Sequence, residues 1–81
     1  MNNLYIKPEQ LKRIKEMYPV GTRVELVQMD DPYNPPPTGT KGTVRGVDDT
    51  GSLLMRWDNG SGLSVVWGID VVKIIDKPDN K

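Results

Sequence analysis

The spacing of apolar residues divides the chain into a helical segment and a strand-rich segment. Between residues 7 and 18, apolar residues such as Leu11 and Ile14 recur at helical spacing, and polar residues fill the other faces. Pro8 suits a first helical turn, and Pro19 disfavours helical backbone at the residue before it. The pattern predicts an amphipathic helix over residues 7–18, which is too short to be stable unless its apolar stripe packs on other elements.

After Gly21 the period changes to two, which is typical of strands with one buried face. Leu53, Met55 and Trp57 show this alternation, and we expect Trp57 to fill the core. The pattern predicts five strands, at residues 22–28, 41–47, 52–58, 62–67 and 71–75.

Turn-forming residues separate these strands. Residues 48–51 predict a turn in which Gly51 has a positive φ, and Asn59-Gly60 predicts a type I′ hairpin. Asp58 is expected to bond the amides of that hairpin turn. The segment Gly68-Ile69-Asp70 is short enough for a single 3₁₀ turn.

Five short strands, a long loop after the first and one turn before the last follow the strand plan of an SH3-like barrel. The sequence therefore predicts a mainly β protein, with a five-stranded SH3-like barrel over residues 19–75. An N-terminal amphipathic α-helix precedes the barrel, and a 3₁₀ turn precedes the last strand. The polar segments 1–6 and 76–81 are expected to be flexible.

Composition narrows the functional classes. The chain has 81 residues, enough for one domain, and its 11 basic and 11 acidic residues give zero net charge, unlike a typical DNA-binding domain. Cys and His are absent, which excludes disulfides, thiolate zinc sites and the usual general base near neutral pH. We expect that the protein is not an enzyme and that it has no cofactor and no metal site. Without a signal-like or membrane-spanning segment, we expect a cytoplasmic protein with no membrane contact.

Four segments resemble a small bacterial and phage family that is catalogued only as a domain of unknown function. They are residues 18–26, 29–33, 39–44 and 55–60. The resemblance spans residues 18–75 and implies an SH3-like barrel carried on phages and other mobile elements of Gram-positive bacteria, without an established activity. Gly39, Gly42 and Val44 also resemble the KOW motif, although tight entry into any barrel strand needs such glycines.

The strongest candidate binding segment is the proline-rich loop over residues 30–39. Its four prolines stiffen the backbone, and an exposed Tyr33 gives a large contact area at modest entropy cost. The alternative is that Tyr33 and the prolines pack over the barrel end, and that Trp67 caps the barrel instead of standing exposed. The candidate partner-binding residues are Asp31, Tyr33, Asn34, Pro36, Arg56 and Trp67.

A locally basic surface supports an alternative function. The candidate nucleic-acid contacts are Lys12, Arg13 and Lys15 of the helix together with Lys41 and Arg45. Interleaved glutamates, Glu9 and Glu16 among them, dilute this charge, as on any soluble helix.

We therefore expect a non-enzymatic binding module, encoded on a phage or mobile element, that docks onto a host protein. Because small mobile-element proteins often counter host defences, the module is predicted to inhibit a defence or nuclease complex. The alternative is a nucleic-acid or nucleotide-binding barrel of SH3-like or KOW-like type, which would use the basic helix and the segment Gly39–Arg45. A third possibility is a subunit joined to a larger assembly through Leu11 and Ile14. The oligomeric state stays open.

Overall fold

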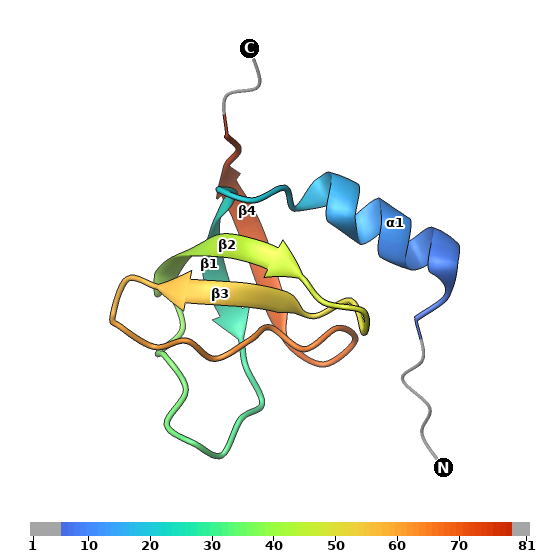
Figure 1. The fold of residues 1–81 in the computed structure, drawn as a ribbon. Coiled ribbons are helices and arrows are strands. Elements are labelled where there is room, and N and C mark those ends of the chain that lie inside the picture. Colours follow the sequence, from blue (N-terminus) through green and yellow to red (C-terminus); the bar gives the residue numbers. More distant parts are fainter. Residues whose placement is uncertain (1–5, 79–81) are drawn as a thin grey trace.

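The computed structural model describes residues 6–78, which form one helix and four antiparallel strands (Figure 1). These elements are α1 (Pro8–Met17), β1 (Arg23–Gln28), β2 (Lys41–Val47), β3 (Leu53–Trp57) and β4 (Val71–Asp76). The strands form an open sheet in the order β3-β2-β1-β4. Of the segments predicted to be flexible, residues 1–5 and 79–81 lie outside the described residues, whereas Asp76 belongs to β4.

The core lies on one face of the twisted sheet, as the alternation predicted. It consists of Val24, Leu26, Val44, Leu53, Met55, Trp57 and Val65. Along β3, buried and exposed residues alternate strictly, and Trp57 is only 1 % exposed, so the prediction that it fills the core is confirmed. Gly42 of β2 lies opposite Trp57, where a Cβ would approach the ring carbon Cε3 to 2.6 Å. The glycine is thus needed for the tryptophan to fit.

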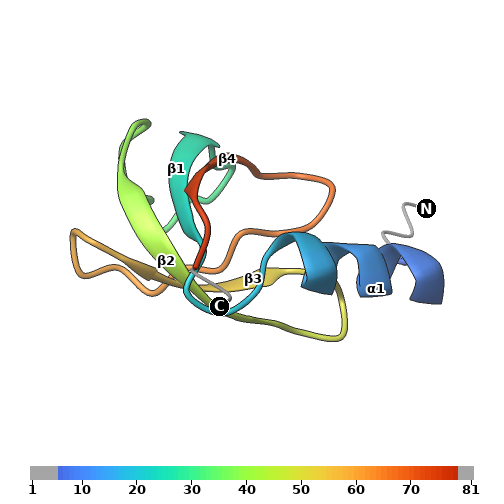
Figure 2. The ribbon, with the colours of Figure 1, turned by 90° about the horizontal axis from the view of Figure 1, so that it is seen from above.

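The helix α1 packs on the sheet by one end. Figure 2 shows that it extends away from the sheet, with its C-terminal end nearest to the strands. Ile14 and Tyr18 are partly buried against the core, and none of the helix residues is fully buried. At the other end, Pro8 occupies the first turn, and the backbone N–H of Lys7 donates to Gln10 Oε1 at 3.0 Å. The helix is therefore an appended element rather than a layer of the core.

The prediction of a fourth strand at residues 62–67 is wrong. This segment forms one isolated bridge, in which Leu53 and Val65 exchange backbone hydrogen bonds of 2.9 and 3.0 Å. The indole N–H of Trp57 donates to the carbonyl of Leu63 at 2.8 Å, and the Leu63 N–H donates to Ser61 Oγ at 3.2 Å. Because side chains take these backbone groups, a regular ladder does not form, and the sheet stays open instead of closing into the predicted five-stranded barrel.

The predicted type of one turn also needs correction. The Asn59-Gly60 turn is not type I′, since Gly60 has φ 94° but Asn59 is not among the described residues with positive φ. The Gly60 N–H instead donates to the Trp57 carbonyl, as in a type I turn followed by a left-handed glycine. Before β4, the Val66 carbonyl accepts the N–H of Ile69, three residues on, at 3.1 Å and that of Asp70 at 3.0 Å, so a single turn forms where a 3₁₀ turn was predicted. The positive φ predicted for Gly51 is confirmed, at 85°.

Candidate functional site

The segment between β1 and β2, residues 29–40, forms a long loop that hydrogen bonds hold at both ends. At its C-terminal end, the Gly39 N–H donates to the Leu26 carbonyl, and the Leu26 N–H donates to the Thr40 carbonyl, both at 2.8 Å. The Thr40 hydroxyl donates to the Pro37 carbonyl at 2.6 Å. With four prolines in addition, the long loop has little conformational freedom.

The loop residues predicted to bind a partner differ in their exposure. Tyr33 is 79 % exposed, so its ring does not pack over the core. Asn34 is exposed and has φ 60°, a left-handed conformation that asparagine tolerates better than most residues. Asp31 accepts the Tyr33 N–H at 2.7 Å and so shapes the turn that presents the tyrosine. Pro36 is buried and anchors the loop instead of offering a contact surface.

The Asp70 carboxylate joins the N-terminal end of the long loop to the turn before β4. One oxygen accepts the backbone N–H of Asp30 and the other accepts that of Val66, both at 2.9 Å. The neighbours Ile69 and Val71 are 40 % and 47 % exposed. Apolar side chains thus lie next to the point where the loop is attached. Sequence reasoning missed this role, because an aspartate before a strand carries no pattern that names distant partners.

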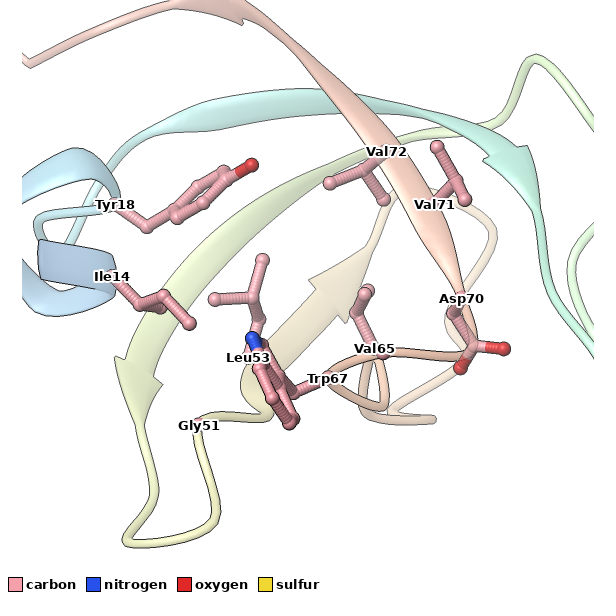
Figure 3. A pocket seen from close by; sticks show the side chains of 10 residues that line it. Ile14, Tyr18, Gly51, Leu53, Val65, Trp67, Asp70, Val71 and Val72 are labelled. Atoms are coloured by element: carbon pink, nitrogen blue, oxygen red, sulfur yellow. The ribbon is translucent and has the colours of Figure 1, made fainter. Parts of the chain in front are cut away.

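Trp67 borders a hollow between α1 and the sheet, with a volume of about 210 Å³. Figure 3 shows Ile14 and Tyr18 on the helix side, facing Leu53 and Trp67 across it. Burial raises the pKa of the Tyr18 hydroxyl. Arg13 and Met17 of the helix line a second hollow that also contacts Trp67. Trp67 is therefore half-buried between two hollows, and the structure places it at the helix junction rather than beside the long loop.

The basic residues do not form one surface. Lys12 and Lys15 line a hollow beside Glu16, whereas Arg13 lies next to Trp67. Arg45 and Arg56, predicted for two different functions, line the same hollow on the outer face of the sheet. Lys41 is exposed on β2, and its charge helps to lower the pKa of Asp58.

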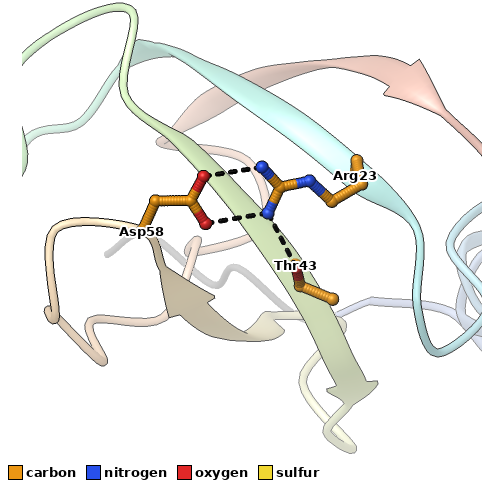
Figure 4. Close-up of polar contacts among 3 residues, drawn as sticks. All are labelled: Arg23, Thr43 and Asp58. Carbon is orange, nitrogen blue, oxygen red and sulfur yellow. Dashed lines mark hydrogen bonds and ion pairs between the residues drawn. The ribbon is translucent and has the colours of Figure 1, made fainter.

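Arg23 of β1, Thr43 of β2 and Asp58, which directly follows β3, form a polar cluster (Figure 4). The guanidinium of Arg23 donates to both oxygens of Asp58, at 2.8 and 2.6 Å, and to Thr43 Oγ1 at 2.9 Å. These hydrogen bonds hold the pKa of Asp58 below its ordinary value and that of Arg23 above its own. The prediction that Asp58 bonds the turn amides is wrong, and the Ser61 N–H donates to Asn59 Oδ1 instead.

Among residues 6–78, no group of three or more His, Cys, Asp or Glu side chains is placed to hold a metal ion. No helix in that range is long and apolar enough to cross a membrane.

Residues 7–75 match the model of DUF4314, a domain of unknown function. The chain belongs to this family. The match covers α1 as well as the sheet, so the helix is part of the family domain, although the sequence resemblance began only at residue 18. No curated protein and no solved structure matches the chain.

Proposed function

We propose that this DUF4314 domain is a non-enzymatic protein-binding module whose main anchor is Tyr33. The observation that carries the proposal is the 79 % exposure of Tyr33 on a loop that is fixed at both ends. An exposed aromatic side chain is stabilising when a partner buries it, and aromatic residues are enriched among binding hot spots. A preordered loop loses little further entropy on binding.

Exposed apolar residues at the base of the long loop support the proposal of a protein-binding surface there. Ile69 and Val71 are exposed beside Asp70, whose carboxylate bonds the first part of the loop. On β1, Val27 is 42 % exposed, and its carbonyl accepts the Thr38 hydroxyl of the loop at 3.3 Å. Exposed apolar side chains at the base of a loop that carries an exposed aromatic residue are what a protein partner buries, whereas a nucleic acid would need cations there.

The resemblance supports a more specific form of this proposal. In that form the domain is an SH3-like module, encoded on a phage or mobile element of Gram-positive bacteria, that acts in the host cytosol. Its partner is a host protein, and the most specific version of the proposal is inhibition of a defence or nuclease complex. The chemistry of the loop supports protein docking, while the setting comes from the resemblance.

The test is affinity capture from a Gram-positive lysate, with the wild-type domain and the Tyr33→Ala variant immobilised side by side. A partner is identified by mass spectrometry, purified and titrated against both domains. We expect Tyr33→Ala to weaken its binding by more than about 1 kcal/mol, because truncation removes the anchor. The circular dichroism melting curve of the variant is expected to match that of the wild type, since the ring is exposed.

The control is Ile75→Ala, which removes a different exposed apolar side chain from β4, 41 % exposed against 79 % for Tyr33. We expect Ile75→Ala to bind as the wild type does. Equal binding by Tyr33→Ala would overturn the assignment of the anchor. Unfolding of Tyr33→Ala would instead support a packing role for the tyrosine.

The second candidate function is nucleic-acid binding, which one observation favours: Arg45 and Arg56 line a common hollow. A parallel capture with nuclease-treated lysate separates the two functions. If every partner disappears after nuclease treatment, or if only nucleic acid is recovered, the protein-binding proposal is wrong.

A further inference from the structure

A hollow on the outer face of the sheet brings together two arginines from neighbouring strands. Arg45 of β2 and Arg56 of β3 are both exposed and line this hollow together with Val20 and Thr43. Its volume is about 460 Å³, and it is distinct from the long loop. Both arginines therefore border a single space that is open to a ligand.

A bulge in the sheet explains the position of Arg45. In the pairing of β2 with β3, Val44 is opposite Met55 and Gly46 is opposite Leu54, so Arg45 is the extra residue. Bulges re-aim side chains and occur more often than expected beside functional sites. Arg45 also lines the adjacent hollow formed with Leu54 and Ser64, so it lies between two concave areas.

Thr43 adds a third donor, which the polar cluster positions. Its Oγ1 accepts a hydrogen bond from Arg23 at 2.9 Å, and Asp58 holds that guanidinium through both carboxylate oxygens (Figure 4). A hydroxyl that accepts through its oxygen still has its own hydrogen to donate. Because Thr43 is opposite Arg56 in the sheet register, this hydrogen is available close to the arginine pair.

No carboxylate is among the residues that line the hollow, and the two carboxylates that form salt bridges within residues 6–78 pair with other cations. Asp58 binds Arg23, and Glu25 lies 3.9 Å from Lys73. Over residues 6–78, neither Arg45 nor Arg56 takes part in a salt bridge. On a chain of zero net charge, the lining of this hollow carries two cations and no carboxylate, so it is locally positive.

We propose that this hollow binds side-chain carboxylates from an acidic segment of a protein. The planar guanidinium group matches a carboxylate through two parallel hydrogen bonds. Val20, which is 67 % exposed, and Leu54, which is 42 % exposed, flank the arginines and offer apolar contacts to the rest of such a segment. Two arginines can contact only a few phosphates of a nucleic acid, whereas a single guanidinium group matches a whole carboxylate, so the hollow fits a carboxylate ligand better.

The test uses the full 81-residue chain, labelled with ¹⁵N and titrated with synthetic hexaglutamate at low salt by NMR. We expect the largest chemical-shift changes at the backbone amides of Thr43, Arg45 and Arg56. The double variant Arg45→Ala/Arg56→Ala is expected to weaken binding by at least about tenfold, because two charge-assisted hydrogen-bonding groups are lost. The matched control is Lys12→Ala/Lys15→Ala, which removes the same charge from α1 and is expected to keep wild-type affinity.

Two further variants separate guanidinium recognition from simple attraction. Arg45→Lys/Arg56→Lys keeps the charge but loses the planar fork, so we expect a partial loss of affinity. Thr43→Val removes the hydroxyl with little change of shape, and we expect several-fold weaker binding with the same fold, as judged by the unperturbed amide spectrum.

Three outcomes would overturn the proposal. They are the absence of hexaglutamate binding, shifts centred on α1 in place of the sheet, and tighter binding of oligothymidylate than of hexaglutamate at these arginines. Tyr33→Ala is expected to leave hexaglutamate binding unchanged, so failure at this hollow is distinguishable from failure of the Tyr33 anchor.

Discussion

At the scale of single residues, two aspartates show how hydrogen bonding outweighs burial. Partial burial raises the pKa of Asp48, but hydrogen bonds from the Thr50 side chain and from the backbone of Thr50 and Ser52 lower it more, so the net pKa is below its ordinary value. For Asp58, the hydrogen bonds from Arg23 are the largest cause, and the pKa is also lowered. Both carboxylates are thus stabilised in their charged form by the folded state.

These shifts predict acid sensitivity. A group whose pKa is lower in the folded protein adds stability above its unfolded pKa, which for both aspartates is near 3.8, and loses it as the pH falls further. We expect the free energy of unfolding, measured by urea titration, to fall as the pH drops from about 5 to below 3. The double variant Asp48→Asn/Asp58→Asn is expected to lose the part of this dependence that the two carboxylates cause.

A comparison with Asp31→Asn controls for a general effect of removing carboxylates, because Asp31 takes part in no salt bridge within residues 6–78. If the double variant kept the full acid dependence of the wild type, these two carboxylates would not be its source. High salt is expected to weaken the Asp58 contribution, since the Arg23 pair is largely exposed.

At the scale of the elements, the pairing of β2 with β3 combines a tight contact in the core with a hollow on the outer face. On the inner side, Gly42 lies against Trp57 and Met55. On the outer side, the bulge at Arg45 opens the hollow that contains Arg56. The same strand pair therefore anchors the fold and shapes a binding surface.

Two glycines of β2 provide a matched test of this packing. In Gly42→Ala, the new Cβ would lie 2.6 Å from Trp57 Cε3 and 3.1 Å from the Arg56 carbonyl, so the core has to shift. We expect a loss of about 1–3 kcal/mol in the free energy of unfolding. In Gly46→Ala, the nearest atom is Leu54 Cδ1 at 3.6 Å, which is ordinary contact, and we expect a much smaller change. Equal losses in the two variants would contradict this account.

At the scale of the whole molecule, the open sheet leaves an end that α1 covers only in part. Ile14 and Tyr18 are the side chains by which the helix packs on the core, and a hollow remains between them and Trp67. The helix has little other packing, and a helix of 10 residues is not stable alone. Its folding therefore depends on this contact.

Hydrogen exchange tests the dependence of α1 on its contact with the core. We expect Ile14→Ala to increase the exchange rates of the α1 amides while the amides of β1 and β2 stay protected, because the helix opens locally without the core. Glu9→Ala, at an exposed position of the same helix, serves as the control and should leave exchange nearly unchanged. Loss of protection throughout the sheet in Ile14→Ala would mean that the helix and the core unfold as one unit.

How much of the structure could be predicted from the sequence depends on how far apart in the chain the interacting residues are. Period-two alternation located β2 at its observed bounds and assigned Leu53, Met55 and Trp57 to the core, because alternation depends only on neighbouring residues. The same reasoning predicted a strand at residues 62–67. It failed there because Trp57 and Ser61 take the backbone groups of Leu63 that a ladder would need.

For the candidate binding surfaces, too, local features could be predicted from the sequence and contacts between distant residues could not. The sequence by itself determined that the chain is mainly β and that a stiff proline-rich loop carries Tyr33. It also determined that the chain contains no Cys and no His. These properties follow from local pattern and composition. The tertiary structure alone decided that Pro36 is buried, that Asp70 fastens the loop and that Arg45 and Arg56 share a hollow. Such contacts join residues far apart in the chain, and they depend on register, a bulge and burial, which no local pattern encodes.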